Sequence, residues 1–314
     1  MTKSNAAGIT NWPDDRSVRV GVIGAGTMGC NHLRVYDSLK NAELVGFYDP
    51  DQQDSKALAE KYRCIAFETP EEAAKAVDAV SICSPSTTHG RVGEFFLNAG
   101  VHCLIEKPLA TNEAECRALI DLAARKNAKL LVGHIERFNP AIRQLSLMLA
   151  GRGQKIHAID IRRLSAVSQR ITDVDVVADL MVHDLDIVID LAGTKVSLNS
   201  AAAVGAGSDR GADHVTALLD LGGDAIACLT ASRITQHTVR RISVTTDTGL
   251  IEVDYINQSV EIYRHDRIKR TQGPAAQFGD YTLDIAMERV QVRRTEPLQL
   301  ELSHFIDIIR QDSE

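Results

Sequence analysis

The sequence VRVGVIGAGTMG, residues 18–29, joins a short apolar run to a glycine-rich turn. Its first half is rich in β-branched residues and stops at a glycine, which is typical of a buried strand. The glycines fit the pattern G-x-G-x-x-G, and a segment with helical periodicity follows and ends near Leu39. In this order the glycines permit a tight turn, close approach of the backbone to a pyrophosphate, and close packing of helix on strand. The stretch therefore predicts a dinucleotide site at a helix N-terminus, where free N–H groups bind anions.

The glycine turn supplies the first candidate cofactor contacts. These are Gly24, Gly26, Thr27 and Met28. The alternative is a glycine-rich turn without a ligand. The position of the motif between a strand and a helix favours the dinucleotide site.

The segments that follow alternate between strand-like and helix-like patterns. Strands are expected at 44–48, 65–67, 79–83, 101–105 and 129–132, and helices at 53–62, 70–76, 89–99 and 112–127. Alternation of this kind builds a parallel sheet with helices on both faces. We therefore expect an N-terminal α/β domain with a doubly wound Rossmann sheet.

The pattern changes after Phe138-Asn139-Pro140. Helices are expected at about 140–149 and 174–191, the second capped by Gly193, and a strand at 156–163. Six strands follow, at 197–204, 214–221, 225–233, 241–246, 250–255 and 260–263, then a loop at 271–280 and a last helix at 298–310. The strands match an antiparallel meander, so we expect an α+β domain with an open, mainly antiparallel sheet. The expected division is a tail at 1–17, a dinucleotide-binding domain at 18–138, and a substrate-binding and oligomerisation domain at 139–314.

Composition restricts the partners. The 314 residues carry 35 Lys and Arg against 42 Asp and Glu, a formal charge of −7, which argues against a nucleic acid polymer as partner. No apolar run reaches the roughly 18 residues that a membrane span needs, and the start lacks the order of a signal peptide, so we expect a cytoplasmic protein. The six cysteines show no C-x-x-C spacing and are expected to be reduced, mostly buried thiols. The histidines show no metal-ligand spacing, so we expect no metal.

Asp49 ends the second expected strand, 25 residues after Gly24. A carboxylate at this place accepts hydrogen bonds from the adenosine ribose hydroxyls and repels a 2′-phosphate, which favours NAD over NADP. The alternative is an acidic turn residue before Pro50.

Two later strands end in polar segments. Ser84-Pro85-Ser86-Thr87-Thr88-His89 follows one, and Glu106-Lys107-Pro108 follows another. Open α/β sheets present ligands at the carboxyl ends of their strands, so Ser84, Pro85, His89, Glu106 and Lys107 are further candidate cofactor contacts. For Glu106 the alternative is a solvated strand end.

Three motifs together resemble the Gfo/Idh/MocA family of oxidoreductases over nearly the whole chain. They are residues 24–29, Glu106-Lys107-Pro108, and the pattern DLMVHDLD at 179–186. The resemblance implies that Lys107, Asp179 and His183 line the nicotinamide and the substrate carbinol, and that the Lys107–Pro108 peptide is cis. It also implies a further helix, after the one expected at 298–310, that packs back on the cofactor domain. Since the chain ends at Glu314, we expect that helix to be missing or the chain to be shortened.

The residues themselves agree with a catalytic role for this helix. Positions 179 and 183 are four apart, so their side chains share one helix face. The alternative is that His183 is buried against the sheet or pairs only with Asp179. In the expected mechanism His183 accepts the hydroxyl proton, Lys107 stabilises the developing alkoxide, and Asp179 orients His183 or bonds a neighbouring hydroxyl. Glu106 would contact the cofactor ribose or position Lys107.

The segment GHIERFNP at 133–140 resembles a branch of the family that acts on nucleotide sugars. Arg137 and Asn139, with Arg163 on the next strand, are candidate contacts to a diphosphate or to sugar hydroxyls, because arginine binds phosphate in a bidentate manner. For the arginines the alternative is a salt bridge. The implied reaction is NAD-dependent oxidation of UDP-N-acetylglucosamine, at C3, to a 3-keto sugar, in the cleft between the two domains. The alternatives are an inositol or free-sugar dehydrogenase and a non-catalytic NAD-binding regulator.

The expected sheet of the second domain has one face without helices. Residues 225–233 carry apolar side chains at both parities of the strand. We therefore expect a second subunit to cover the open face, in a homodimer or homotetramer. The alternative is that a chain end covers it.

Overall fold

The computed structural model describes residues 16–166, 175–205, 211–265 and 285–311. Most of the expected N-terminal tail and the whole expected loop at 271–280 lie outside these residues. The chain forms two compact units. The first contains the described residues up to Ile135 and those from Glu296 onward, and the second contains those from Glu136 to Thr295.

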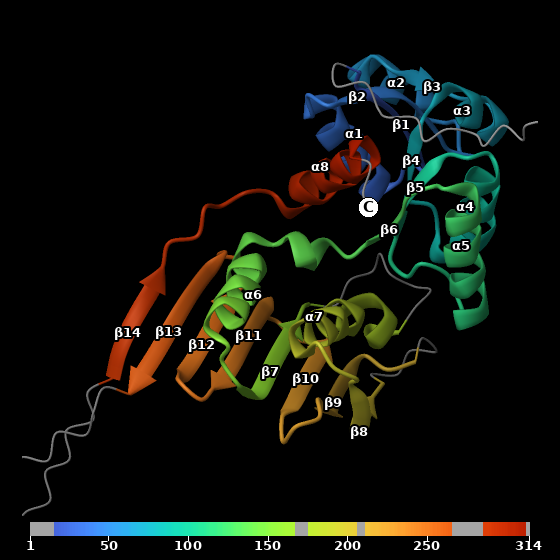
Figure 1. The fold of residues 1–314 in the computed structure, drawn as a ribbon. Coiled ribbons are helices and arrows are strands. Elements are labelled where there is room, and N and C mark those ends of the chain that lie inside the picture. The colour runs from blue at the N-terminus through green and yellow to red at the C-terminus, as the bar shows by residue number, and fades with distance from the viewer. Residues whose placement is uncertain (1–15, 167–174, 206–210, 266–284, 312–314) are drawn as a thin grey trace, which may run out of the picture. The chain divides into compact units, whose positions relative to one another are not determined.

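The first unit is built on a parallel six-stranded sheet in the order β3-β2-β1-β4-β5-β6 (Figure 1). Its strands are β1 (Val18–Ile23), β2 (Ala42–Tyr48), β3 (Ile65–Ala66), β4 (Ala79–Ile82), β5 (His102–Glu106) and β6 (Leu130–Gly133). Its helices are α1 (Thr27–Ser38), α2 (Ser55–Tyr62), α3 (Pro70–Ala76), α4 (His89–Asn98), α5 (Glu113–Lys126) and α8 (Pro297–Arg310), with a short 3-10 turn η1 (Ser86–Thr88) before α4. β2 and β3 lie on one side of β1, and β4, β5 and β6 lie on the other. The carboxyl ends of β1 and β4 therefore flank the switch point at which doubly wound sheets bind ligands.

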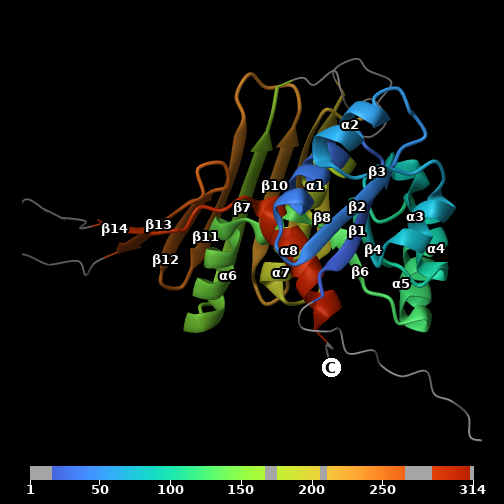
Figure 2. The same ribbon diagram turned by 90° about the horizontal axis from the view of Figure 1, so that it is seen from above.

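Helices cover both faces of this sheet. Figure 2 shows α1 and α8 on one side and α3, α4 and α5 on the other. One core joins α1, α2 and α8 to residues such as Val20 and Val22, and the other joins α3, α4 and α5 to residues such as Val80 and Ile82. Because successive side chains of a strand point to opposite faces, each apolar strand contributes to both cores. The expected Rossmann fold is confirmed.

The C-terminal helix α8 belongs to this first unit. One face of the helix carries apolar residues spaced three or four apart that are all buried: Leu298, Leu302, Phe305, Ile306 and Ile309. They pack in the same core as β1 and α1. This differs from the expected division, which assigned 139–314 to one domain. The helix expected at 298–310 is therefore present as α8, and it packs within the first unit.

The second unit contains an eight-stranded sheet in the order β14-β13-β12-β11-β7-β10-β9-β8. Its strands are β7 (Ile156–Leu164), β8 (Ser197–Val204), β9 (His214–Asp220), β10 (Ile226–Ser232), β11 (Val239–Thr246), β12 (Gly249–Asp254), β13 (Ser259–His265) and β14 (Ile285–Val290). Its helical segments are η2 (Ile135–Phe138), which begins at the unit boundary, α6 (Pro140–Arg152), the π-helix η3 (Val177–Met181) and α7 (Val182–Ala192). α6 and α7 lie on the same side of the sheet, where they share its core (Figure 1).

Three details of this unit differ from the expected meander, the first being the edge strand β14, which was not expected. β7 lies between β10 and β11 and pairs with β10 in parallel, so β10 and β11, although consecutive in the chain, are not neighbours in the sheet. The expected helix at 174–191 is also not uniform, since its first described turn, η3, is a π-helix. Its C-terminal cap is Gly193, as expected, in the left-handed conformation with φ +60°.

The six cysteines all lie within the described residues and form no disulfide. Only Cys103 is buried, and the other five are half-buried, which is more exposure than we expected. Among the described residues, none of the helices has the length and apolar character that a membrane crossing requires.

Candidate cofactor and active site

The glycine turn has the geometry that a dinucleotide site requires. Gly24 has φ +92°, and a Cβ there would lie 2.7 Å from the backbone nitrogen of Ser84. A Cβ on Gly29 would lie 1.8 Å from the carbonyl oxygen of Gly24, so glycine at this position allows α1 to pack against the turn. At Gly26 nothing lies within 4 Å of a Cβ, so the turn is open on that side.

The start of α1 is free to receive an anion. No side chain caps it, and its first turn carries no acidic residue. The unpaired N–H groups and the helix dipole therefore favour a negative ligand at this end. This observation, together with the open side at Gly26, fits a pyrophosphate group.

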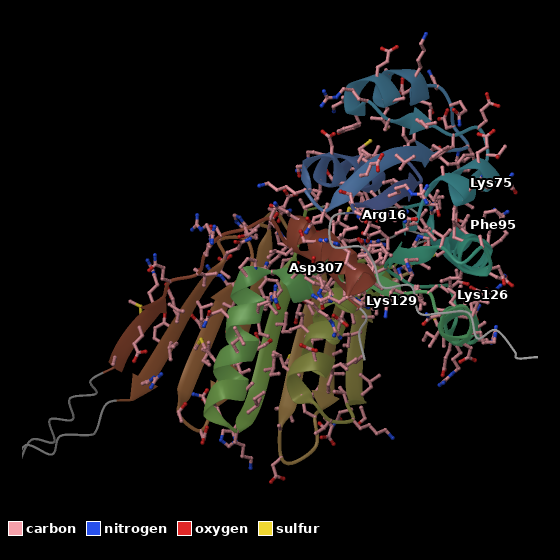
Figure 3. The ribbon with its side chains drawn as sticks, turned by 45° about the horizontal axis from the view of Figure 1, so that its top comes forward. Arg16, Lys75, Phe95, Lys126, Lys129 and Asp307 are labelled. Atoms are coloured by element: carbon pink, nitrogen blue, oxygen red, sulfur yellow. The ribbon has the colours of Figure 1, made fainter. Side chains whose placement is uncertain are left out.

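A cavity of about 670 Å³ lies at this turn. Five of the predicted cofactor residues line it: Gly24, Gly26, Asp49, Ser84 and Pro85. Its wall also contains residues that the motifs did not indicate: Tyr48, Pro50, Pro70, Glu71, Thr88, Arg91, Val92 and Phe95, the last labelled in Figure 3. The other predicted contacts, Thr27, Met28, His89, Glu106 and Lys107, are not part of this lining.

Asp49 is tied to the glycine turn by its carboxylate. Its Oδ2 accepts a hydrogen bond of 2.6 Å from the backbone N–H of Ala25, and its Oδ1 accepts one of 2.8 Å from Asp51. The side chain therefore acts as a turn residue, as the alternative expectation held, and it also lines the cavity. The two roles are compatible because each carboxylate oxygen has two lone pairs.

His89 links the loops that follow β4 and β5. Its ring is 1% exposed, with Nδ1 2.7 Å from the carbonyl oxygen of Pro108 and Nε2 2.8 Å from that of Ser84. Only a ring with hydrogen on both nitrogens donates to both oxygens at once. Both ring nitrogens therefore contact backbone carbonyl oxygens within the protein, and His89 holds the two loops together. The Lys107–Pro108 peptide is cis, as expected.

Glu106 is not a solvated strand end. Its Oε1 lies 3.0 Å from Nε2 of His32, a fully buried residue of α1. Its carboxylate lies over Gly133 of β6, where a Cβ would be 3.0 Å from the Glu106 Oε2. The motif carboxylate is therefore anchored to the helix that starts at the glycine turn.

A second buried carboxyl group lies near Glu106. Glu301 of α8 is 0% exposed, and neither of its side-chain oxygens has a hydrogen-bond partner. Burial, and then the charge of the nearby Glu106, raises the pKa of Glu301 to about 9. The amphipathic pattern of α8 did not predict the burial of this residue, because glutamate side chains are usually exposed.

In the second unit, Asp179 lies in η3 and His183 in the first turn of α7. Asp175 starts this segment, since its Oδ1 accepts hydrogen bonds from the N–H groups of Val177 and Ala178. Asp179 is buried and His183 is half-buried. π-Helical turns are rare and occur often at functional sites. A π-helical turn is also wider than an α-helical turn. Asp179 and His183, four residues apart, therefore lie on the same helix face only approximately.

A buried ion-pair network holds α7 in the second unit. Arg163 of β7 donates to Asp184 through Nε and Nη2, at 3.0 and 2.8 Å, and to Glu136 through Nη1 at 2.9 Å. Its guanidinium also lies over the ring of Tyr255 at 5.3 Å. Burial alone lowers the pKa of Arg163, but the charges of Asp184 and Glu136 raise it above its ordinary value. Asp184 directly follows His183, so the network fixes the backbone next to that residue.

This network changes the interpretation of two candidate substrate contacts. The Arg163 side chain is only 3% exposed and is fully paired. The Asn139 amide is also buried, and it donates to Glu136 and to the Tyr255 carbonyl while its oxygen caps α6 through Ala141. Both residues therefore serve the structure of the second unit. Sequence reasoning identified Arg163 but missed its partners Glu136 and Asp184.

Arg137 is the candidate substrate contact that stays accessible. Its side chain is 41% exposed, and it pairs with Asp186 at 2.6 and 2.7 Å and with Asp190 at 3.2 Å. These two aspartates are four residues apart on α7. A phosphate ligand would therefore have to compete with the bidentate Asp186 pair.

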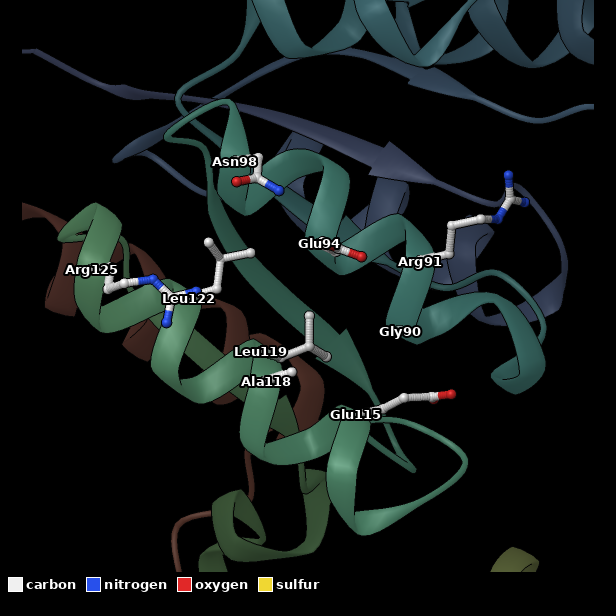
Figure 4. Close-up of a pocket in the computed structure, with 9 residues that line it drawn as sticks. All are labelled: Gly90, Arg91, Glu94, Asn98, Glu115, Ala118, Leu119, Leu122 and Arg125. Carbon is white, nitrogen blue, oxygen red and sulfur yellow. The ribbon is translucent and has the colours of Figure 1, made fainter.

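A second hollow of the first unit, of about 380 Å³, lies between α4 and α5 (Figure 4). Its charged side chains are Arg91, Arg125, Glu94 and Glu115. Because these charges balance, the hollow lacks the positive field that a phosphate ligand needs. The described residues contain no group of three or more His, Cys, Asp or Glu side chains placed to hold a metal ion.

The similarities to known proteins agree with this geometry. Residues 18–134 match the model of an oxidoreductase family with an NAD-binding Rossmann fold. The chain is 37% identical over 246 residues to a UDP-N-acetylglucosamine 3-dehydrogenase from Acidithiobacillus ferrooxidans, covering 78% of this chain and 77% of that protein. The chain belongs to the Gfo/Idh/MocA oxidoreductase family.

Whole-chain comparisons extend this assignment. A solved structure of UDP-N-acetylglucosamine 3-dehydrogenase from the same organism superposes with a TM-score of 0.83 and 33% identity, covering 93% of this chain and 89% of that one. An inositol 2-dehydrogenase from Rhizobium meliloti is 28% identical, covering 95% of this chain and 90% of that protein. A 3-ketoreductase from Actinomadura kijaniata in complex with TDP-benzene and NADP shares the fold, with a TM-score of 0.79 at 18% identity, covering 94% of this chain and 90% of that one.

Proposed function

We propose that this oxidoreductase is an NAD-dependent dehydrogenase that oxidises a secondary hydroxyl of a nucleotide sugar, C3 of UDP-N-acetylglucosamine being the first choice. The observation that carries the proposal is the similarity to UDP-N-acetylglucosamine 3-dehydrogenase in sequence and over nearly the whole fold. The cavity at the glycine turn supports it, because its shape and free helix start suit a dinucleotide.

The residues around the adenosine end of the cavity favour NAD. Asp49 and Glu71 both line it, and Arg91 is the basic residue among them. A 2′-phosphate next to Asp49 would add negative charge beside a carboxylate that is already fixed by two backbone N–H groups. The glycine turn would hold the pyrophosphate. When bound, the nicotinamide supplies the hydride acceptor.

The proposed roles of the protein groups follow the chemistry of alcohol oxidation. His183 accepts the hydroxyl proton, Lys107 stabilises the negative charge that develops on the same oxygen, and Asp179 orients His183. Arg137 contacts the diphosphate of the substrate, in exchange for part of its pairing with Asp186. Arg163 and Asn139, given their burial, support α7 and α6 from within the second unit.

NADH absorbance tests this proposal. The wild-type enzyme is offered NAD with UDP-N-acetylglucosamine, myo-inositol or glucose, each with and without an added 2-keto acid as final acceptor. We expect NADH formation with the nucleotide sugar and loss of at least about a hundredfold in kcat for His183→Asn. Turnover of myo-inositol alone would identify the inositol dehydrogenase instead. Binding of NAD without reduction by any sugar would identify a regulator.

We further propose a homodimer or homotetramer that assembles through the sheet of the second unit. Its strand β8 is exposed along its whole length, and large apolar side chains are exposed on its strands: Leu198, Val204, Ile226 and Met287. Exposed apolar surface of this kind marks an interface. Light scattering after size exclusion measures the assembly, and a monomer at micromolar concentration would contradict this part of the proposal.

A further inference from the structure

Two buried histidines hold the residues on either side of Lys107. His32, from α1, contacts the side chain of Glu106, the residue before Lys107, at 3.0 Å. His89, from α4, contacts the carbonyl oxygen of Pro108, the residue after it, at 2.7 Å. Both rings are essentially without solvent exposure, at 0% and 1%. Lys107 itself is half-buried.

The two contacts connect Lys107 to the parts of the first unit that line the cofactor cavity. His32 stands on the helix that begins at the glycine turn. His89 begins α4, which follows the Ser84-Pro85 loop, and its second nitrogen lies 2.8 Å from the Ser84 carbonyl oxygen. Both Ser84 and Pro85 line the cavity. A displacement of the glycine turn or of the Ser84-Pro85 loop would therefore be transmitted to the turn that carries Lys107.

The hydrogen-bond geometry defines what each ring must supply. A carboxylate and a carbonyl oxygen are acceptors only, so the ring nitrogen that faces each of them carries hydrogen. At His32 this is Nε2, and at His89 the nitrogen that faces Pro108 is Nδ1. Because both rings are buried in the packed interior, removal of either donor breaks a hydrogen bond that ties Glu106 or Pro108 to a helix of the first unit.

We propose that His32 and His89 are positioning residues that hold Lys107 in its working place by anchoring Glu106 and Pro108. The proposal rests on the proposed role of Lys107 at the substrate oxygen. Neither histidine touches the cofactor or the substrate in this assignment. The cost of a misplaced catalytic group is large, since a displacement of about 1 Å lowers rates by up to about a hundredfold.

Four replacements test this assignment because asparagine and glutamine mimic different ring nitrogens. An asparagine amide nitrogen lies close to the place of Nδ1, and a glutamine amide nitrogen close to that of Nε2. His32→Gln and His89→Asn therefore keep the donor that faces the motif. His32→Asn and His89→Gln remove it while changing size and polarity to a similar degree, so they are matched controls.

We expect His32→Asn and His89→Gln to lower kcat by about tenfold or more, with the KM for sugar and the Kd for NAD changed less than about threefold. His32→Gln and His89→Asn should stay within about threefold of wild type. Equal losses in all four variants would mean that the rings serve only burial and packing, and equal activity in all four would mean that they do not position Lys107. Either result overturns the proposal.

A second readout does not depend on the substrate. The rate of reductive methylation of Lys107, followed by mass spectrometry, reports how its amine is held, while the exposed Lys75 and Lys126, labelled in Figure 3, serve as references within the same molecule. We expect the rate at Lys107 to rise at least threefold in His32→Asn and His89→Gln alone. An unchanged rate would overturn the positioning role even if no sugar is turned over, so its failure is distinguishable from failure of the proposed function.

Discussion

Glu301 gives the sharpest prediction on stability. Its carboxyl group is fully buried in α8 without a hydrogen-bond partner, and its pKa is raised to about 9 by burial and by Glu106. In the folded chain it keeps its proton up to about pH 9, whereas in the unfolded chain it loses the proton near its ordinary value of 4.5. Folding therefore takes up a proton between these pH values, and the free energy of unfolding falls as the pH rises.

The size of this effect follows from the two pKa values. Each pH unit between 4.5 and 9 lowers the free energy of unfolding by about 1.4 kcal/mol. At pH 7 the ionisation of Glu301 in the unfolded chain thus lowers the free energy of unfolding by on the order of 3 kcal/mol relative to pH 4.5. Glu301→Gln keeps the shape and the neutral charge of the protonated acid but releases no proton on unfolding. We expect the variant to match wild type near pH 4.5 and to be more stable by about 3 kcal/mol at pH 7.

Urea unfolding of both proteins from pH 5 to pH 9 measures this difference. For a unit of this size the gain corresponds to roughly 6 to 12 °C in the melting temperature at pH 7. Glu60→Gln is the matched control, because Glu60 is an exposed residue of α2 in the same unit and should show no such trend. Parallel pH profiles for wild type and Glu301→Gln would refute the reasoning, since they would mean that Glu301 is ionised in the folded protein.

Three further predictions concern the glycine turn, the cofactor and the second unit. Gly29→Ala places a methyl group 1.8 Å from the Gly24 carbonyl oxygen, so α1 must shift, and the Kd for NAD measured by calorimetry should rise at least about tenfold. Asp49→Asn removes the charge that repels a 2′-phosphate while keeping an acceptor for the turn, so the ratio of NAD to NADP affinity should fall roughly tenfold; an unchanged ratio would contradict the role of Asp49. Arg163→Met leaves the buried Asp184 carboxylate unpaired, which should cost about 3–5 kcal/mol in urea unfolding of the second unit; a cost below about 1 kcal/mol would show that the pair is dispensable.

Structure was easiest to predict from the sequence where it depends on residues that are close together in the chain. The glycine turn after β1 is such a case, because Gly24, Gly26 and Gly29 are neighbours in sequence and the close contact that Gly29 permits is with Gly24 itself. The strands of the parallel sheet were also predictable, since their apolar runs are short and bounded by glycine or charge. Asp49 was found by its distance from the turn, although its hydrogen bond to Ala25 was not.

Contacts between distant segments could not be predicted in this way. The apolar stripe of α8 shows that the helix packs against something, but nothing in its pattern says that the partner is β1, whose residues lie nearly 300 positions earlier. The insertion of β7 between β10 and β11 is hidden for the same reason, since pairing depends on the partner strand and not on the strand itself. Glu301 is a special case, because its burial contradicts the usual place of a glutamate.

The two candidate arginines differ in burial for the same physical reason. Both residues carry a guanidinium group and both were candidate contacts to a diphosphate. The Arg137 side chain is 41% exposed, whereas the Arg163 side chain is 3% exposed. The difference lies in partners that are distant in sequence: Glu136 and Asp184 enclose Arg163, while Asp186 and Asp190 hold Arg137 at the surface of α7. The Arg163 guanidinium is held by two carboxylates and is almost inaccessible to a ligand, whereas a surface ion pair is worth little and exchanges readily. If an arginine of this segment binds the diphosphate, it is therefore the accessible Arg137. Arg137→Ala should then raise the KM for a nucleotide sugar while leaving the KM for a free sugar unchanged.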